Sequence, residues 1–344
     1  MRGLLIVNPQ ATATSPRVTD VIVAALSAGS TRATDQELRI EVVRTQHRGH
    51  AGELGRQARR DGLDIVITLG GDGTINEVVN GMLGTDLTNP PAAHEVPMIA
   101  TVPGGSANVF ARALGLPVDP VEATGELLAA IAQRHTRLLG LGSVEITSPE
   151  DTLPTPRWFL ANIGLGFDAE IIAAMETQRA AGFTATPGRY LRTTLRQFFA
   201  KTDRREPALT MRRAGNDTID DIFLAIVQNT SPWTYLGPLA IDACPHASFD
   251  SDLDVCAIRK MGIATALRMS RRLLSGSLAG STKRSISLWH DQRDFTITAR
   301  RPTPIQVDGE GLGPVTVAHL RAHPVALRTV VPLPPVAASP MESD

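Results

Sequence analysis

Residues 69–77 read Leu-Gly-Gly-Asp-Gly-Thr-Ile-Asn-Glu, and this stretch decides the fold of the first part of the chain. Residues 64–69 form a mostly apolar, β-branched run with the length of a buried strand. Apolar residues recur at helical spacing behind it, and Thr74 and Glu77 have the spacing of a capping box that would start this helix. Three glycines and a carboxylate thus separate a strand from a helix, where backbone N–H groups can hold phosphate. A tight turn in which glycine only supplies a positive φ has the same local pattern.

A second strand–glycine–helix unit follows the first. Residues 98–102 are another buried-type strand, residues 103–108 read Pro-Gly-Gly-Ser-Ala-Asn, and residues 109–114 have a helical pattern. Two such units would place two phosphate-accepting loops at the same edge of a parallel sheet, where open α/β sheets bind ligands. The remaining elements predicted in this part are strands at 4–7 and 38–43 and helices at 16–26, 50–58 and 121–131.

The composition excludes several classes of protein. The chain has 344 residues, a formal net charge of −1 and two cysteines, Cys244 and Cys256. The length suggests two domains, and the near-neutral charge argues against a general nucleic-acid-binding protein. Two distant cysteines indicate neither a disulfide framework nor a zinc site, as is typical of a reducing cytoplasm. We expect no signal peptide, and no apolar run approaches the roughly 20 residues that a membrane span needs.

The pattern changes near residue 137 to short β-patterned runs separated by turns. We therefore predict an α/β domain over residues 1–137, a mainly antiparallel β domain over 138–330, and a disordered tail over 331–344 that is rich in Pro, Ala and Ser. The predicted strands are 142–146, 158–163, 222–227, 253–258, 286–288, 295–298, 305–307 and 315–318.

Both glycine-rich loops resemble those of a known family. Gly-Gly-Asp-Gly-Thr followed by Asn76-Glu77, and Pro-Gly-Gly-Ser-Ala-Asn, are similar to motifs of the diacylglycerol kinase and sphingosine kinase superfamily, and in particular of bacterial diacylglycerol kinase-like lipid kinases. NAD kinases are distantly similar but have no second segment of this kind. Val-Asp-Gly-Glu at 307–310, which alone is typical of a hairpin turn, resembles the family's Asp-Gly-Glu. The resemblance covers residues 3–325 in order, and it implies a three-layer α/β parallel-sheet domain, an antiparallel β-sandwich domain and an active site in the cleft between them.

The resemblance also implies roles for individual residues. Glu310 would be the general base that takes the proton of a lipid hydroxyl, Asp308 would organise a metal ion or orient that base, and Asp72 would act beside the nucleotide. The carboxylate of Asp250 would hold a structural Mg²⁺ together with the carbonyls of Ala247 and Asp252, an oxygen-only set that suits a hard cation. The residues placed at ATP are Asn8, Thr45, Gly70, Gly71, Asp72, Gly73, Thr74, Ile75, Asn76, Gly104, Gly105 and Ser106.

Some features depart from the family's pattern or have two interpretations. Gly140 stands where the family carries an Asp, and Ser251 stands where it carries a Gly. The His47 and His50 pair could indicate a metal site or a solvated helix start. Residues 164–169, Gly-Leu-Gly-Phe-Asp-Ala, formally match a dinucleotide fingerprint but better resemble the family's turn at the inter-domain cleft. The helix that this turn would open is interpreted as core. Two basic amphipathic stretches, 190–201 and 264–278, suit either an anionic membrane surface or ordinary solvated helices.

These observations are interpreted as an ATP-dependent lipid kinase that uses Mg²⁺ and phosphorylates diacylglycerol to phosphatidate. The chain has no Gly-Lys pair and so no Walker A loop, and it has neither His-Arg-Asp nor Asp-Phe-Gly, which excludes other kinase designs. Other acceptors in the same superfamily remain as alternatives: another lipid alcohol such as a sphingoid base, or NAD. A catalytically silent lipid- or nucleotide-binding protein is an alternative of a different class. We expect a cytoplasmic enzyme at the inner face of the membrane, with no nucleic-acid partner and with a homodimer left open.

Overall fold

The computed structural model describes most of the chain: residues 1–11, 15–29, 38–150, 153–166, 207–213, 215, 217–236, 239–259 and 286–334. The predicted turn beyond residue 166 and the helix that it would open lie outside the described residues. So do the basic stretches 190–201 and 264–278 and the tail beyond residue 334. No helix in the described part of the chain is both long and apolar enough to cross a membrane.

The N-terminal domain is built on four parallel strands with the spatial order β4-β3-β1-β2. The β3 strand is buried along its whole length, because it runs between two neighbours and under helices on both faces. The strands are β1 (Arg2–Val7), β2 (Arg39–Arg44), β3 (Ile65–Gly70) and β4 (Met98–Pro103).

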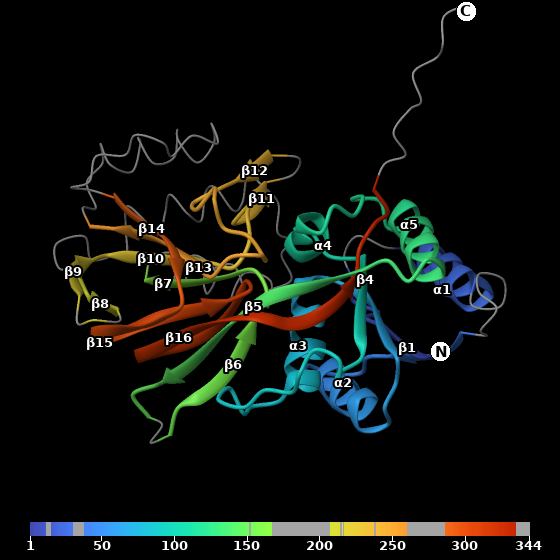
Figure 1. The fold of residues 1–344 in the computed structure, drawn as a ribbon, viewed down its shortest axis with the longest axis horizontal. Coiled ribbons are helices and arrows are strands. Elements are labelled where there is room, and N and C mark those ends of the chain that lie inside the picture. The colour runs from blue at the N-terminus through green and yellow to red at the C-terminus, as the bar shows by residue number, and fades with distance from the viewer. Residues whose placement is uncertain are drawn as a thin grey trace, which may run out of the picture.

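Helices cover both faces of this sheet, which makes three layers (Figure 1). Buried residues of α1 and α5 share one apolar cluster with one face of the strands, and those of α2 and α3 share another cluster with the opposite face. The fourth helix is a short one at the end of β4. The helices are α1 (Pro16–Gly29), α2 (His50–Arg60), α3 (Asp72–Leu83), α4 (Val109–Ala113) and α5 (Pro120–Ala132).

Helices α2 and α3 pack backbone against backbone. A Cβ atom placed on Gly55 would lie 2.5 Å from the carbonyl oxygen of Val78, so only glycine permits this distance. The same contact brings Glu77 to the start of α2, where its Oε1 accepts a hydrogen bond of 3.0 Å from the N–H of Gly49. The predicted capping box is therefore wrong: α3 begins at Asp72, two residues before Thr74, and Glu77 caps the neighbouring helix.

The C-terminal domain consists of antiparallel strands around a core of its own, as the sequence predicted. The apolar side chains that point inward include Phe159, Val255, Phe295 and Leu320, all of them buried. Its strands are β5 (Thr136–Thr147), β6 (Thr155–Phe159), β7 (Asn162–Gly166), β8 (Leu209–Arg213), β9 (Thr218–Ile222), β10 (Leu224–Gln228), β11 (Thr234–Leu236), β12 (Leu239–Ile241), β13 (Leu253–Ile258), β14 (Ile286–Gln292), β15 (Asp294–Val307) and β16 (Glu310–Val330).

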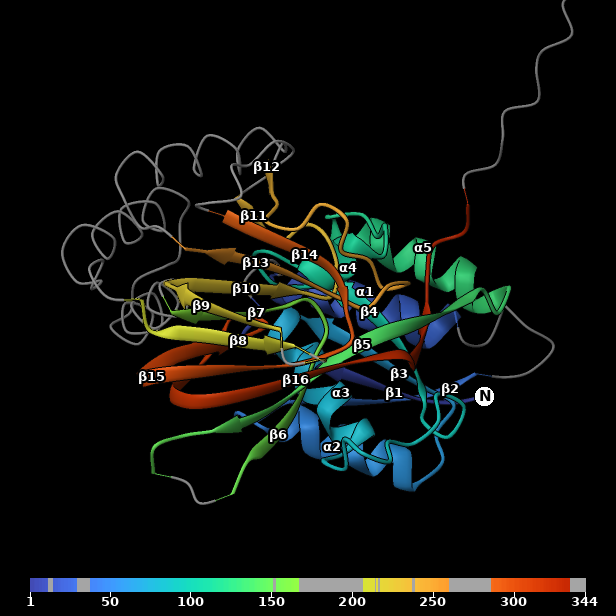
Figure 2. The ribbon, with the colours of Figure 1, turned by 60° about the vertical axis from the view of Figure 1, so that its left-hand side comes forward.

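One long strand, β16, belongs to both domains. It pairs antiparallel with β5 and β15, and Thr329 near its end lies parallel to Ile99 of β4. The Thr329 hydroxyl donates a 3.0 Å hydrogen bond to the Ile99 carbonyl. A single sheet of 14 strands therefore runs through the molecule, and β5 and β16 cross between the two parts side by side (Figures 1 and 2). The sequence predicted only residues 315–318 of this strand, because two prolines and a bulge interrupt its pattern.

The strand predicted at 158–163 is two strands in the structure. β6 ends at Phe159 and β7 begins at Asn162, so the backbone turns at Leu160 and Ala161. The N–H groups of these two residues donate to the carboxylate of Asp308 instead of to a neighbouring strand. Asp308, which is far away in the sequence, interrupts the strand by accepting these hydrogen bonds, and the local apolar pattern does not predict this interruption.

Candidate active site

The two glycine-rich loops lie in contact at the carboxyl ends of β3 and β4. The N–H of Gly104 donates a 2.8 Å hydrogen bond to the carbonyl of Gly70. A Cβ atom placed on Gly105 would lie 2.7 Å from the Cα of Gly71, so a side chain there would push the loops apart. A Cβ atom on Gly73 would meet nothing within 4 Å. The loops therefore present a surface of bare backbone toward open space, which is the kind of surface that accepts phosphate groups.

The ends of the neighbouring strands are fixed to these loops. Asn8 follows β1; its Nδ2 donates to the hydroxyl of Thr74 at 3.0 Å, and its N–H donates to the carbonyl of Leu69 at 2.9 Å. Thr45 follows β2 and donates its N–H to the carbonyl of Val7. Ser106 is exposed in the second loop. The structure thus brings the residues predicted at ATP to one edge of the sheet.

Asp72 joins the first glycine loop to α4. Its carboxylate accepts hydrogen bonds from the N–H groups of Val109 (3.1 Å) and Phe110 (3.0 Å), the first residues of that helix. Burial raises the pKa of Asp72, while the two backbone donors oppose this shift. A carboxylate at a helix N-terminus is stabilised by the helix dipole. Asp72 therefore holds the second loop in place, in addition to the predicted role beside the nucleotide.

Asp308 accepts four hydrogen bonds, three from the C-terminal domain and one, from Asn76, across to the N-terminal domain. Its Oδ1 accepts from the N–H groups of Ala161 (2.8 Å) and Asn162 (3.0 Å), and its Oδ2 accepts from the N–H of Leu160 (2.8 Å) and from Nδ2 of Asn76 (2.7 Å). Burial raises the pKa of Asp308, and the donors act against it. Both oxygens are engaged by protein groups, so this carboxylate acts on the position of its neighbours.

Asp308 and Gly309 also form the two-residue turn between β15 and β16. Both have positive φ, +47° and +81°, which is the backbone of a type I′ hairpin turn. The N–H of Gly309 donates to Oε1 of Gln306 at 2.7 Å. The turn directs the next residue, Glu310, toward the N-terminal domain. The hairpin interpretation and the family motif therefore apply to the same residues.

Two asparagines of α3 contact the C-terminal domain. Asn76 and Asn80 lie one helical turn apart, and the Nδ2 atom of each donates to the carbonyl of Trp158 at 3.0 Å. Oδ1 of Asn80 accepts from the N–H of Trp158 at 2.9 Å. The side chain of Asn76 is thus committed to the contact between domains. Sequence reasoning missed Asn80; the signal was a polar pair at i, i+4 in an otherwise apolar helix.

Glu310 lies between two arginines that the sequence analysis did not single out. Its Oε1 accepts from Arg48 of the N-terminal domain, and its Oε2 accepts from Arg157 of β6. The Arg157 side chain is 23% exposed, and burial lowers its pKa. The Arg48 side chain is 72% exposed, and Arg48 lies in the segment between β2 and α2. The candidate base is therefore held against the N-terminal domain by one partly buried and one accessible cation.

Asp250, predicted to hold a structural Mg²⁺ with the carbonyls of Ala247 and Asp252, forms an ion pair in the structure. Its carboxylate is paired with the guanidinium of Arg137, and both side chains are partly exposed. The N–H of Ala247 donates to the Cys244 carbonyl, and the N–H of Asp252 donates to Oδ1 of Asp291. Among the described residues, no group of three or more His, Cys, Asp or Glu side chains is placed to hold a metal ion.

Gly140 has a packing reason. Its N–H donates to the Phe249 carbonyl at 2.8 Å, and a Cβ atom there would lie at the same distance from that oxygen. The aspartate that the family carries at this position would not fit in this chain. In the His47 and His50 pair that the sequence analysis considered, His50 is the first residue of α2, and its Nδ1 accepts a hydrogen bond from the N–H of Gln46.

Comparison with known proteins supports a kinase assignment of this site. Residues 2–144 match the family "Diacylglycerol kinase catalytic domain". The chain is 28% identical to "Probable lipid kinase YegS-like" of Stenotrophomonas maltophilia over 307 residues, 87% of this chain and 88% of that one. It is 40% identical to "Diacylglycerol kinase" of Bacillus subtilis over 73 residues, 21% of this chain and 22% of that one.

Solved structures share the fold. A diacylglycerol kinase from Bacillus anthracis superposes with a TM-score of 0.66 at 18% identity, covering 96% of both chains. The yeast NADH kinase superposes with a TM-score of 0.50 at 11% identity, covering 97% of this chain and 84% of that one. The predicted fold class, an α/β domain followed by an antiparallel β-rich domain, is confirmed, and so is the resemblance to diacylglycerol kinase-like lipid kinases.

Proposed function

Because residues 2–144 match the diacylglycerol kinase catalytic domain family, we propose that this protein is an ATP-dependent lipid kinase that phosphorylates diacylglycerol to phosphatidate. The observation that carries the proposal is the contact of the Glu310 side chain with the N-terminal domain. Arg48 links Glu310 to the segment after β2, and Asn76 links the adjacent Asp308 to the helix of the first glycine loop. The N-terminal domain thus supplies a backbone that can accept phosphate, and the C-terminal domain supplies the Glu310 carboxylate at the contact between the two domains.

In the proposed reaction the chain supplies position and charge. The N–H groups of the two glycine loops would hold the phosphates of ATP. The hydroxyl oxygen of the lipid forms a bond to the γ-phosphorus, the bond from that phosphorus to the bridging oxygen of ADP breaks, and the hydroxyl proton goes to Glu310. Arg48 and Arg157 place positive charge beside the same carboxylate, where they can also stabilise the transferring phosphoryl group.

Mg²⁺ enters this proposal with the nucleotide. Mg²⁺ in kinases takes much of its coordination from substrate phosphates and water, with one or two carboxylates, and it would neutralise charge on the phosphates. Asp72 lies within the first glycine loop and Asp308 bonds to Asn76 of the helix that follows this loop, and both carboxylates already accept backbone hydrogen bonds. The lipid acceptor requires contact with the membrane surface, so we place the enzyme peripherally at the inner face of the membrane.

The proposal is tested with purified protein, labelled ATP and Mg²⁺ against a panel of lipid alcohols in mixed micelles. We expect transfer to diacylglycerol, and the panel includes a sphingoid base and NAD as the competing acceptors. Transfer to one of these instead would keep the kinase and replace its substrate. ATP binding without transfer to any acceptor would make the protein a silent nucleotide-binding protein.

The Asp250 position does not fit a structural Mg²⁺, because Arg137 already supplies positive charge at the carboxylate. We therefore expect MgCl₂ and EDTA to give the same thermal midpoint for the nucleotide-free wild type. Asp250→Asn should lower stability only slightly, since an exposed ion pair contributes about 0–1 kcal/mol. Differential scanning calorimetry measures both effects, with Asp20→Asn in the exposed Arg44 pair as the matched control. A rise of the midpoint with MgCl₂ that Asp250→Asn removes would restore the metal site.

A further inference from the structure

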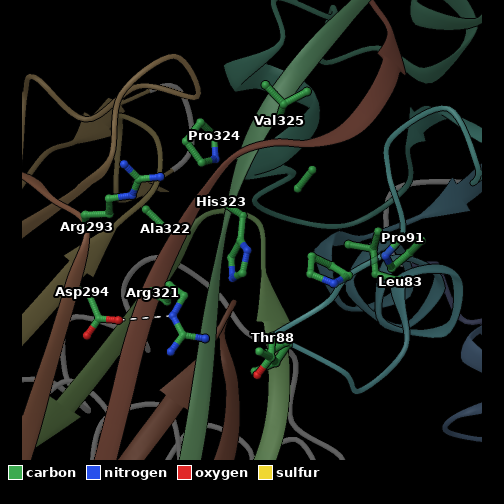
Figure 3. Close-up of a pocket in the computed structure, with 13 residues that line it drawn as sticks. Leu83, Thr88, Pro91, Arg293, Asp294, Arg321, Ala322, His323, Pro324 and Val325 are labelled. Carbon is green, nitrogen blue, oxygen red and sulfur yellow. Dashed lines mark hydrogen bonds and ion pairs between the residues drawn. The ribbon is translucent and has the colours of Figure 1, made fainter.

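A pocket of about 500 Å³ lies between the two domains, at the far end of α3 from the glycine loops. Leu83 at the end of α3 and the loop after it form one side, and the start of β15 and the bulge of β16 form the other (Figure 3). The rise of 1.5 Å per residue along α3 separates this pocket from Asp72 by about 16 Å. The pocket is therefore distinct from the candidate active site.

The pocket has a continuous apolar part. Leu83 and Leu87 lie on the N-terminal side, and Val325, with 59% of its surface exposed, lies on the bulge of β16. Figure 3 shows Leu83 and Pro91 facing the strand that carries His323. A pocket of a few hundred Å³ with a mainly apolar lining and a few polar groups is the usual form of a small-ligand site. The other apolar lining residues are Pro90, Ala322, Pro324 and Ala326.

The polar part of the pocket has an excess of positive charge. Arg293 and Arg321 line it together with one carboxylate, Asp294. Asp294 already accepts a 3.2 Å hydrogen bond from Nε of Arg321 and one of 2.9 Å from Nε2 of His319. Burial raises the pKa of Asp294, but these hydrogen bonds outweigh it and keep the pKa below its usual value. Asp294 is thus ionised and neutralised by its own partners.

Both guanidinium groups keep donors available. Arg321 uses Nε toward Asp294, and in Figure 3 the dashed line to Asp294 runs to this nitrogen and not to the two terminal nitrogens. Among the described residues, Arg293 has no ion-pair partner, and its side chain extends toward Pro324 (Figure 3). A guanidinium presents paired N–H donors that match the oxygens of a phosphate group.

His323 forms the back wall and connects the pocket to Trp158. Burial and the charge of Arg321 lower the pKa of His323 to about 4, so the ring is neutral near pH 7. The imidazole lies 4.5 Å from the Trp158 ring, centroid to centroid, and Nε2 is 2.8 Å from the hydroxyl of Ser143. Trp158 Nε1 donates to the carbonyl of Gly84, in the segment that leads to the pocket. A ligand here would change the surroundings of this indole.

We propose that this pocket binds a lipid phosphate, with the phosphate group at Arg293 and Arg321 and the acyl chain along Leu83, Leu87 and Val325. The excess positive charge of Arg293 and Arg321 favours an anion, and the apolar part of the pocket favours an amphiphile over inorganic phosphate. Binding of a lipid phosphate in this pocket requires no turnover, so it can be tested independently of the proposed kinase reaction.

The test uses dihexanoyl phosphatidic acid below its micelle concentration, with inorganic phosphate and dihexanoylglycerol as the other arms. Binding is followed by calorimetry and by tryptophan fluorescence. We expect saturable binding of the lipid phosphate alone, and at least about tenfold weaker binding for Arg293→Gln, the equivalent of one charge-assisted hydrogen bond. Arg293→Gln/Arg321→Gln should abolish the fluorescence change. Equal affinity for inorganic phosphate would overturn the lipid part of the proposal.

Two control variants locate the signal. Arg300→Gln changes an arginine of β15 that is 60% exposed and lies outside the pocket, and it should leave binding unchanged. Glu310→Gln changes the candidate active site and should keep the fluorescence signal. If Glu310→Gln loses the signal, or if the double arginine variant keeps it, lipid phosphate binds in the cleft and the pocket proposal is wrong.

Discussion

Glu310→Gln is expected to lower kcat by about 10²–10⁴-fold while the KM for ATP stays nearly unchanged, which is the effect of removing a general base. Glutamine keeps the size of the side chain and one acceptor oxygen, so it retains a hydrogen bond with Arg48 or Arg157. It cannot accept a proton from the lipid hydroxyl. The measurement is a steady-state lipid kinase assay at saturating ATP, with the lipid concentration varied.

The matched control is Glu145→Gln, which changes another partly exposed carboxylate in the C-terminal domain. Glu145 lies on β5 and accepts from His319 at 3.2 Å, and no predicted active-site residue is among its partners. We expect Glu145→Gln to keep the wild-type kcat and both variants to keep the wild-type circular dichroism spectrum. A wild-type rate in Glu310→Gln would mean that another group takes the proton, with Asp72 the next candidate.

Asp308→Asn should lower the free energy of unfolding by about 2–6 kcal/mol, because two of the four donors around the carboxylate would face an amide NH₂ group. Each buried donor that loses its acceptor costs about 1–3 kcal/mol. Urea denaturation monitored by fluorescence measures the change. Activity should fall with it, since the turn that directs Glu310 depends on this carboxylate.

The control for this variant is Asp20→Asn on α1, whose exposed carboxylate is 3.3 Å from Arg44. It should change the free energy of unfolding by less than about 1 kcal/mol. If Asp308→Asn is as stable as Asp20→Asn, the four hydrogen bonds contribute little, and the link between the domains must come from the bonds of Asn76 and Asn80 to Trp158.

The sequence predicted well what depends on neighbouring residues. The run at 64–69, the glycines after it and the helical spacing behind them are local, and β3 and α3 form there. The second unit, β4 followed by α4, was predicted for the same reason. The short, mostly apolar run at 253–258 likewise identified β13 with its observed bounds, and all six residues of this strand are buried.

The missed features all join residues that are far apart in the chain. Arg48 and Glu310 are separated by 262 positions, and Asn80 and Trp158 by 78. No periodicity reports such a pair, and an exposed arginine after a strand looks like any surface charge. The capping-box prediction was wrong for the same physical reason. Glycines let α2 and α3 approach closely, and Glu77 therefore accepts a hydrogen bond from the N–H of Gly49 at the start of α2.

The shared strand β16 also sets the order in which the molecule can be completed on the ribosome. Ile99 and Thr329 are 230 residues apart, which takes about 10–50 s of synthesis at about 5–20 residues per second. During that time β4 is paired only with β3, and its other side is an open edge of the kind that recruits foreign strands. The N-terminal domain therefore leaves the ribosome early with one edge of β4 unpaired. We expect nascent chains to need a chaperone until Thr329 of β16 has been synthesised and pairs with that edge.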